Sequence, residues 1–464
     1  MKTEARTDMR LPAVAGRFYP SDPEELRRQV ETCLTRSGDG ARPPGAGPRA
    51  VISPHAGYAF SGWLTGAAWQ ATAQARPETI VILSPSHRHA FDGVALPAQQ
   101  GYAMPGFDVP VDRAAAGALV QAGLAHVEDA AHDNEHGIET QLAFLHHLHP
   151  QAKLVPLVIG RCKTERVAAI IDHLATQADT PPLFVLSSDL SHFLTRQAAE
   201  AHDLETARLI ETGDYAALTP AHACGAQALR GFLASRHGQG QRVQRLAMAS
   251  SAEVTGDDSR TVGYGAWAFF HTTDEVFLPP HRAGLLTAAR QTLASRLKKG
   301  KTPDVNIDSF APPLRGHGAA FVTLQKEGRL RGCIGSLRAH QPLIRDVVEN
   351  TVKSGFNDPR FRPLEVDEMT TIRIKIAVLS PSAPMQFESE AALLDQIVPE
   401  RDGLILSDQD KRGVFLPMVW ESLPTPEAFL NGLKVKAGLP KDHWSETLQI
   451  HRFCAESFAE PDSA

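Results

Sequence analysis

Short apolar runs alternate with longer amphipathic stretches over the first 270 residues. The apolar runs have the length of buried strands, and the amphipathic stretches repeat apolar residues with the period of a helix. Strands are predicted at 50–52, 79–83, 153–159, 183–186, 243–249 and 262–270. Helices are predicted at 62–74, 113–122, 138–148, 166–178, 197–211 and 225–235. This alternation predicts an α/β domain with a largely parallel sheet covered by helices on both faces.

The pattern changes near residue 271. A proline pair, Pro279-Pro280, interrupts it, and an amphipathic helix is predicted at 284–298. Beyond that helix the chain is typical of an α+β domain. Its predicted elements are hairpins at 319–334 and 404–416, a strand at 372–379 and helices at 343–354 and 428–438. We therefore predict a first domain at 10–270, a linker at 271–282 and a smaller second domain at 283–460.

Composition excludes several classes of protein for this chain of 464 residues and net charge −6. No apolar run approaches the roughly 18 residues that a membrane-spanning helix needs. The first eight residues carry charges of both signs and no apolar segment follows them, so we expect no secretory signal and a cytoplasmic protein. No cluster of lysine and arginine interleaved with aromatic residues occurs, so we expect no nucleic-acid surface.

Three predicted strands end in loops that carry a histidine. His55 follows the strand at 50–52, His87 follows 79–83, and His192 follows 183–186. Ligands of open α/β sheets bind at the carboxyl ends of the strands, where such loops gather. Neutral imidazole nitrogens suit iron, copper and zinc. His55 and His87 are therefore candidate metal ligands.

Cys224 is the candidate third ligand. The five cysteines are dispersed and show no C-x-x-C spacing, which argues against a disulfide framework. Cys224 precedes the predicted helix at 225–235, and a helix start lowers the pKa of a thiol. Two histidines and one anionic residue form the type of site that binds iron. Spacing alone leaves open that His55, His87 and Cys224 are unrelated buried residues.

Carboxylates and histidines outside this set allow two interpretations each. Asp189 lies three residues before His192 and could orient it as a general base beside a metal, or it could cap a turn. Glu135 and His136 precede a predicted helix and fit either chemistry or capping, whereas capping is favoured for Glu139. The histidine-rich run 146–149 is expected to be a solvated helix end.

These motifs resemble those of the Memo family. The resemblance covers residues 10–270 and includes, in order, GRFYP (16–20), SPHAGY (53–58), LSPSH (83–87), EHGIE (135–139), SSDLSH (187–192) and ACG (223–225). The second domain is similar to the AMMECR family through LRGCIG (330–335), DPRF (358–361) and LPMVW (416–420). Within LRGCIG, Cys333 lies between two glycines and is either a buried small residue or a reactive thiol. Together the two families are known as proteins B and A of AmmeMemoRadiSam systems, whose third component is a radical-SAM enzyme.

The resemblance implies a first domain related to class III extradiol dioxygenases. It implies that His55, His87 and Cys224 bind a metal, foremost Fe(II), with copper as the alternative and zinc less favoured. His192 would be the catalytic histidine, with Asp189 in the same cleft. The implied activity is that of a non-haem iron, dioxygenase-like oxidoreductase that works with a radical-SAM partner.

The alternative is a non-catalytic, metal-dependent binding or scaffolding protein that recognises a peptide or a modified residue. One departure from the family bears on the ligand. Relatives carry arginine and histidine after Cys-Gly, whereas this chain has Gly225-Ala226-Gln227. The loss of those cations weakens the expectation of an anionic substrate or of a strongly lowered pKa of Cys224.

Overall fold

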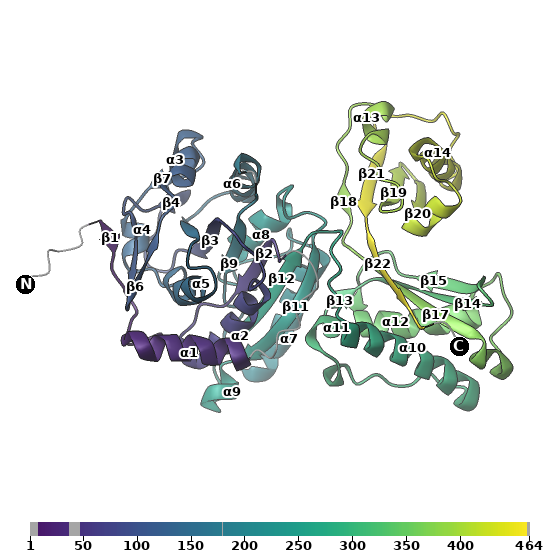
Figure 1. The fold of residues 1–464 in the computed structure, drawn as a ribbon, viewed down its shortest axis with the longest axis horizontal. Helices are drawn as coiled ribbons and strands as arrows, with labels where there is room; N and C mark the ends of the chain where they lie inside the picture. Colours follow the sequence, from purple (N-terminus) through teal and green to yellow (C-terminus); the bar gives the residue numbers. More distant parts are fainter. Residues whose placement is uncertain (1–7, 37–46, 179, 462–464) are drawn as a thin grey trace, which may run out of the picture. The chain divides into compact units, whose positions relative to one another are not determined.

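The computed structural model describes residues 8–36, 47–178 and 180–461 of the chain. It contains two compact units. The first extends to Phe270 and the second begins at His271, except that Gly240–Arg242 belong to the second unit. Within the described residues, no helix is long and apolar enough to cross a membrane. Figure 1 shows the elements of both units.

A nine-stranded sheet forms the centre of the first unit. Its central strands are parallel and lie in the order β2 (Ala50–Ser53), β9 (Leu183–Ser187), β3 (Thr79–Pro85) and β8 (Lys153–Ile159). Antiparallel pairings flank this core, because β12 (Thr261–Phe270) runs against β2, and β4 (Val94–Leu96) runs against β8. The outer strands are β10 (His192–Leu194), β11 (Arg242–Ser250) and β7 (His126–Val127). The predicted parallel arrangement therefore holds for the centre of the sheet and for the β4–β7 pair at one edge, whereas β12 and β4 join the centre in antiparallel fashion.

Helices cover the sheet. Every residue of β2 and β9 is buried, as expected for strands covered on both faces. Helix α2 (Tyr58–Ala71) packs against β2 and β12, and α8 (Ala226–Ala234) packs against β3 and β9. The remaining helices of this unit are α1 (Pro23–Arg36), α3 (Arg113–Gln121), α4 (Ala130–Asp133), α5 (Leu142–Leu148), α6 (Thr164–Gln177), α7 (Arg196–Thr212) and α9 (Ala252–Thr255).

A small second sheet in the first unit was not predicted. It joins β1 (Met9–Arg10) to β5 (Gly101–Met104) and β6 (Phe107–Pro110). The three strands are two to four residues long, too short for a hydrophobic period to identify them. Their pairing brings the beginning of the chain alongside residues 101–110.

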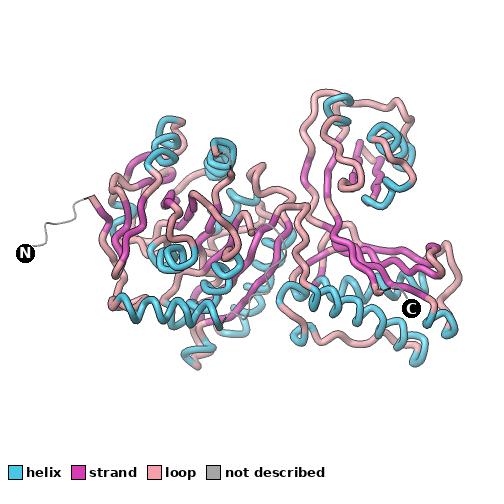
Figure 2. Tube along the Cα trace, in the orientation of Figure 1, coloured by secondary structure: helices cyan, strands magenta, loops and turns pink. Residues whose placement is uncertain are grey.

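The second unit contains two four-stranded sheets, in agreement with the predicted α+β class. The first has the order β15 (Arg329–Gly335), β14 (Ala320–Lys326), β17 (Ile372–Leu379) and β22 (Ala455–Ala459). Helices α10 (Pro279–Lys299) and α12 (Leu343–Val352) pack along it, and Figure 2 shows them in cyan beside the magenta strands. Helix α10 begins at Pro279, inside the segment predicted as a linker, because proline suits the first turn of a helix.

The second sheet of this unit has the order β18 (Ala383–Pro384), β21 (Gln449–Phe453), β19 (Gly403–Asp408) and β20 (Lys411–Phe415). Helices α13 (Glu390–Leu394) and α14 (Pro426–Lys436) accompany it. Leu404, Leu406, Trp420 and Phe429 belong to its buried core. Short elements complete the unit, namely α11 (Pro312–Arg315), β13 (His317–Gly318) and β16 (Gln341–Pro342).

Candidate metal centre

The candidate site lies at the ends of three neighbouring parallel strands. Because β2, β9 and β3 lie side by side and point the same way, the loops that follow them meet at one edge of the sheet. His55 lies in the loop after β2, and His87 in the loop after β3. Asp189 and His192 follow β9. The structure thus brings together the loops that the sequence analysis had singled out.

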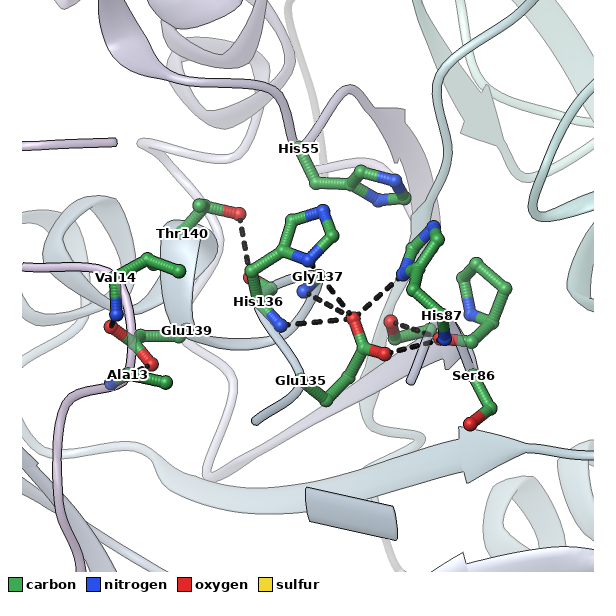
Figure 3. A network of polar contacts seen from close by, with 12 residues as sticks. Ala13, Val14, His55, Ser86, His87, Glu135, His136, Gly137, Glu139 and Thr140 are labelled. Atoms are coloured by element: carbon green, nitrogen blue, oxygen red, sulfur yellow. Dashed lines mark hydrogen bonds and ion pairs between the residues drawn. The ribbon is translucent and has the colours of Figure 1, made fainter. Parts of the chain in front are cut away.

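The histidines of this edge form a cluster with a member that the sequence had left undecided. His136 lies beside His55 and His87, and one ring nitrogen from each of the three lies within 4.8 Å of the others. The ring centroids are 4.9 Å apart for His55 and His87, 5.3 Å for His55 and His136, and 4.5 Å for His87 and His136. Figure 3 shows the three rings turned toward a common point. This geometry suits an ion bound between imidazoles.

Hydrogen bonds determine which nitrogen of each ring remains available. The Ser187 hydroxyl donates to the carbonyl of Gly137 at 2.6 Å, so at 2.8 Å it accepts the Nδ1–H of His55. The Nδ1 atom of His87 lies 2.8 Å from Oε1 of Glu135, to which it donates. In both rings the Nε2 atom therefore carries the lone pair, and that of His55 lies 3.3 Å from the sulfur of Cys224. Second-shell bonds of this type orient metal-binding histidines in proteins.

Glu135 is the residue that holds His87. One carboxylate oxygen accepts the backbone N–H of His87 at 2.7 Å, and the other accepts the N–H groups of His136 and Gly137, both at 2.9 Å (Figure 3). Burial opposes ionisation of this carboxyl, but the bonds from His87 and Gly137 outweigh burial and lower its pKa to about 2. Glu135 is therefore an anion that both caps its own turn and orients His87, so the two interpretations of this residue hold together.

The electrostatic setting keeps His55 and His136 neutral at neutral pH. Burial, followed by the neighbouring His87, lowers the pKa of His55 to about 3. Burial, followed by His55, lowers the pKa of His136 to about 4. Unprotonated imidazole is the form that binds metals. The rings of His55 and His136 consequently present lone pairs rather than positive charges.

Cys224 lies next to the histidines but outside their close group. Its Sγ atom is 3.3 Å from Nε2 of His55 and accepts the backbone N–H of Asp189 at 3.2 Å. The expectation of a lowered thiol pKa is wrong. Helix α8 begins only at Ala226, and burial, followed by the charge of Asp189, raises the pKa of Cys224 to about 12.

Asp189 and His192 are both near the cluster but are not bonded to each other in the predicted way. Asp189 is buried and accepts the backbone N–H of His55 at 2.9 Å, and its other oxygen lies 3.9 Å from Nε2 of His55. Burial raises the pKa of Asp189. The Nδ1 atom of His192 donates to the carbonyl of Leu190 at 2.9 Å, so a backbone group rather than Asp189 orients this ring.

Glu139, for which capping was favoured, holds the N-terminal segment. Its carboxylate pairs with Arg10, accepts the backbone N–H groups of Ala13 and Val14 at 2.8 and 3.0 Å, and accepts the Tyr19 hydroxyl at 2.5 Å. The capping interpretation is wrong because these partners lie about 120 positions away in the sequence. Figure 3 shows Glu139 on the far side of the turn that carries His136.

Fold and site together define an α/β protein with a candidate imidazole-rich metal centre at the carboxyl edge of its sheet. Residues 10–268 match the family described as Memo-like protein, and residues 286–458 match the family described as AMMECR1. The chain belongs to the Memo family, and its second part is an AMMECR1 domain fused to the first.

Two curated relatives agree with this assignment. A MEMO1 family protein of Methanopyrus kandleri is 33% identical over 279 residues, which cover 56% of this chain and 98% of the relative. A MEMO1 family protein of Methanothermobacter thermautotrophicus is 32% identical over 273 residues, covering 55% and 98%. The crystal structure of an uncharacterized protein of Pyrococcus horikoshii is 33% identical, covers 38% of this chain and 90% of its own, and has a TM-score of 0.36.

Proposed function

We propose that the first unit binds one transition-metal ion through Nε2 of His55, Nε2 of His87 and the sulfur of Cys224. The observation that carries this proposal is the convergence of imidazoles whose Nδ1–H groups are already bonded elsewhere. His136 lies near enough to be a further donor. Cys224 would complete the set through its position 3.3 Å from His55.

Donor chemistry favours iron. Two imidazoles and one anionic ligand form a set that suits Fe(II), and the softer thiolate also accommodates copper, with zinc less favoured. A metal binds thiolate rather than thiol, so binding would release the proton that burial holds on Cys224. When bound, iron or copper would supply Lewis acidity and one-electron redox chemistry at this edge of the sheet.

The protein's own residues would handle protons there. His192 donates Nδ1–H to Leu190, which leaves its Nε2 as the proton-accepting atom. We propose His192 as the general acid or base and Asp189 as the residue that holds the backbone of His55. This is an oxidoreductase activity of the dioxygenase type implied by the family resemblance.

Metal analysis of purified variants tests the ligand set. We expect about one metal ion per chain in the wild type and in His340→Ala, an exposed histidine of the second unit. We expect little metal in His55→Ala or His87→Ala and reduced metal in Cys224→Ser. The metal content of His136→Ala shows whether His136 is a fourth donor in addition to the three proposed ligands. Equal metal content in His55→Ala and the wild type would refute the site.

Oxygen uptake distinguishes catalysis from binding. The iron-loaded protein, supplied with catechols or small thiols, is expected to consume oxygen, and His192→Ala is expected to slow that consumption. The alternative role, as a metal-dependent binding or scaffolding protein, would be favoured if the metal-loaded protein consumed no oxygen. His192→Ala should then be indistinguishable from the wild type in binding assays.

The partner that we propose is a radical-SAM enzyme, in keeping with the joining of Memo and AMMECR1 domains in one chain. Co-purification of the full chain with such an enzyme under anaerobic conditions tests this. A complex that survives gel filtration supports it, and separate elution at micromolar concentrations of both proteins contradicts it.

A further inference from the structure

One face of the sheet β18–β21–β19–β20 in the second unit carries basic side chains. Leu404 of β19 belongs to the buried core on one side of this sheet, so Ile405 and Ser407, which alternate with it, belong to the other face. The strand register places His451 of β21 directly opposite Ile405. It places Arg412 of β20 directly opposite Ser407. His451 and Arg412 therefore flank β19 on the same face.

The loop that follows β15 brings a second arginine to this face. Leu337 of that loop packs against the cluster of buried residues that contains Ile405. The next residue, Arg338, has an exposed side chain, and Nδ1 of His340 donates to its backbone carbonyl at 3.2 Å. This bond supports the backbone beside Arg338 before any ligand arrives, and such preorganisation lowers the cost of binding.

The positive charges of both arginines act on His451. Burial, followed by Arg338 and then Arg412, lowers the pKa of His451, and no carboxylate contributes to the shift. In the part of the chain that the structure describes, neither guanidinium forms an ion pair or a side-chain hydrogen bond. Like charges that gather without a negative partner repel each other, so an anion bound between them would be stabilised.

The number of charges indicates which anion fits. Guanidinium groups match the oxygens of a phosphate group, which has a charge of about −1.5 to −2 near neutral pH. A carboxylate would balance only one of the two arginines. The face also offers a hydroxyl group, because Ser407 is half-buried and forms no hydrogen bond through its side chain within the described residues.

We propose that Arg338, Arg412 and His451 bind a phosphate group, with Ser407 as a further hydrogen-bond donor. This site belongs to the second unit alone and does not depend on the metal centre. The partly buried side chains of Leu337 and Val414 pack against the same cluster as Ile405. The organic part of a phosphate ester could therefore contact an apolar surface beside the site.

Three anions test the preference of the full-length protein at constant ionic strength. They are phenyl phosphate, benzoate, which has the same ring and a single charge, and inorganic phosphate. By ligand-observed NMR titration at pH 7.5 we expect phenyl phosphate to bind about tenfold more tightly than benzoate. Inorganic phosphate that binds more weakly than phenyl phosphate would identify an ester as the ligand, and equal or tighter binding would identify free phosphate. Benzoate that binds as tightly as both phosphates, or no binding of either phosphate, would overturn the proposal.

Variants of the two exposed arginines locate the site. Arg338→Gln and Arg412→Gln are each expected to weaken binding of phenyl phosphate about tenfold. Arg412→Lys keeps the charge but not the planar fork of donors, so a smaller loss is expected. The matched control is Arg329→Gln, which removes one positive charge from an exposed position at the beginning of β15. Equal affinity in the wild type, Arg338→Gln and Arg412→Gln would refute the site.

The imidazole of His451 provides a local signal for binding. Its proton resonance is identified as the one that is missing from the spectrum of His451→Gln. We expect this resonance to shift when phenyl phosphate is added to the wild type, and not to shift in the double variant Arg338→Gln, Arg412→Gln. A resonance that stays in place while the wild type binds phenyl phosphate would show that the ligand binds elsewhere, which would refute the proposal.

Discussion

The Nε2 atom of His55 lies 3.3 Å from the Sγ atom of Cys224, although 169 positions separate the two residues. The position of His55 is determined by the pairing of β2 with β9. The position of Cys224 is determined by a close backbone contact of its loop with the end of β9. A Cβ atom on Gly225 would lie 2.6 Å from the Cβ of Ser188 and 2.7 Å from the carbonyl oxygen of Ser187. Glycine at 225 is therefore the residue that lets the cysteine loop approach the end of β9.

Gly225→Ala tests this dependence. The added methyl group must push the loop away from Ser187 and Ser188, which moves the sulfur away from His55. We expect metal affinity to fall at least about tenfold and stability to fall by about 1–3 kcal/mol, as in other overpacked sites. Isothermal titration with the metal measures the first, and urea unfolding measures the second. Gly117→Ala, which meets nothing within 4 Å, is the matched control.

Glu135→Gln tests the orientation of His87. An amide has one accepting oxygen instead of two, so it cannot serve both the ring and the backbone of His87 together with two further N–H groups. We expect metal affinity about 10–100-fold weaker, the range seen for second-shell carboxylates. Competition with a chelator measures it, with Glu253→Gln at an exposed position as the control. Unchanged affinity would mean that His87 needs no such support.

Glu139→Leu tests the anchor of the N-terminal segment. Removal of this buried carboxylate leaves Arg10 without its ion-pair partner, and loss of one member of a buried pair costs about 3–5 kcal/mol. Urea unfolding of the first unit measures the loss. The double variant Arg10→Met, Glu139→Leu should recover part of it, because both charges are then absent. A double variant that is less stable than Glu139→Leu would contradict this explanation.

His149 makes the first unit sensitive to acid. The prediction of a solvated helix end is wrong for this residue, which is buried and bonded through Nε2 to Thr72 at 2.8 Å. Burial, followed by Arg76, lowers its pKa from 6.5 to about 4 in the folded protein. The unfolded chain therefore binds the proton more tightly, so the stabilising contribution is complete above pH 6.5 and is lost as the pH falls toward 4.

His149→Gln keeps a donor for Thr72 but does not titrate. We expect the free energy of unfolding of this variant to fall less steeply between pH 6.5 and 4, by up to about 1 kcal/mol per pH unit. Urea unfolding at a series of pH values measures the slope. Several other buried histidines, including His132, have a lowered pKa of the same sense, so an acid-dependent slope should remain in the variant. Parallel pH profiles for variant and wild type would contradict the role of His149.

The sequence by itself determined the elements with long apolar runs. The strands predicted at 153–159 and 372–379 have the observed bounds of β8 and β17, because burial on one or both faces dictates residue type along the whole strand. It also indicated which loops carry His55, His87 and His192, since polar clusters after buried strands are visible in the chain. Strands as short as β1 contain too few residues for an apolar pattern to identify them in the sequence.

Only the tertiary structure decided what those residues touch. His136 joined the histidine cluster, Glu135 became the partner of His87, and Glu139 became the partner of Arg10, all through contacts between segments far apart in the chain. The pKa of Cys224 likewise followed from burial rather than from its place before a helix. The pattern of apolar and polar residues along a segment shows which of its positions are buried. The partner of a hydrogen bond and the desolvation of a charged group depend instead on residues that only folding brings together.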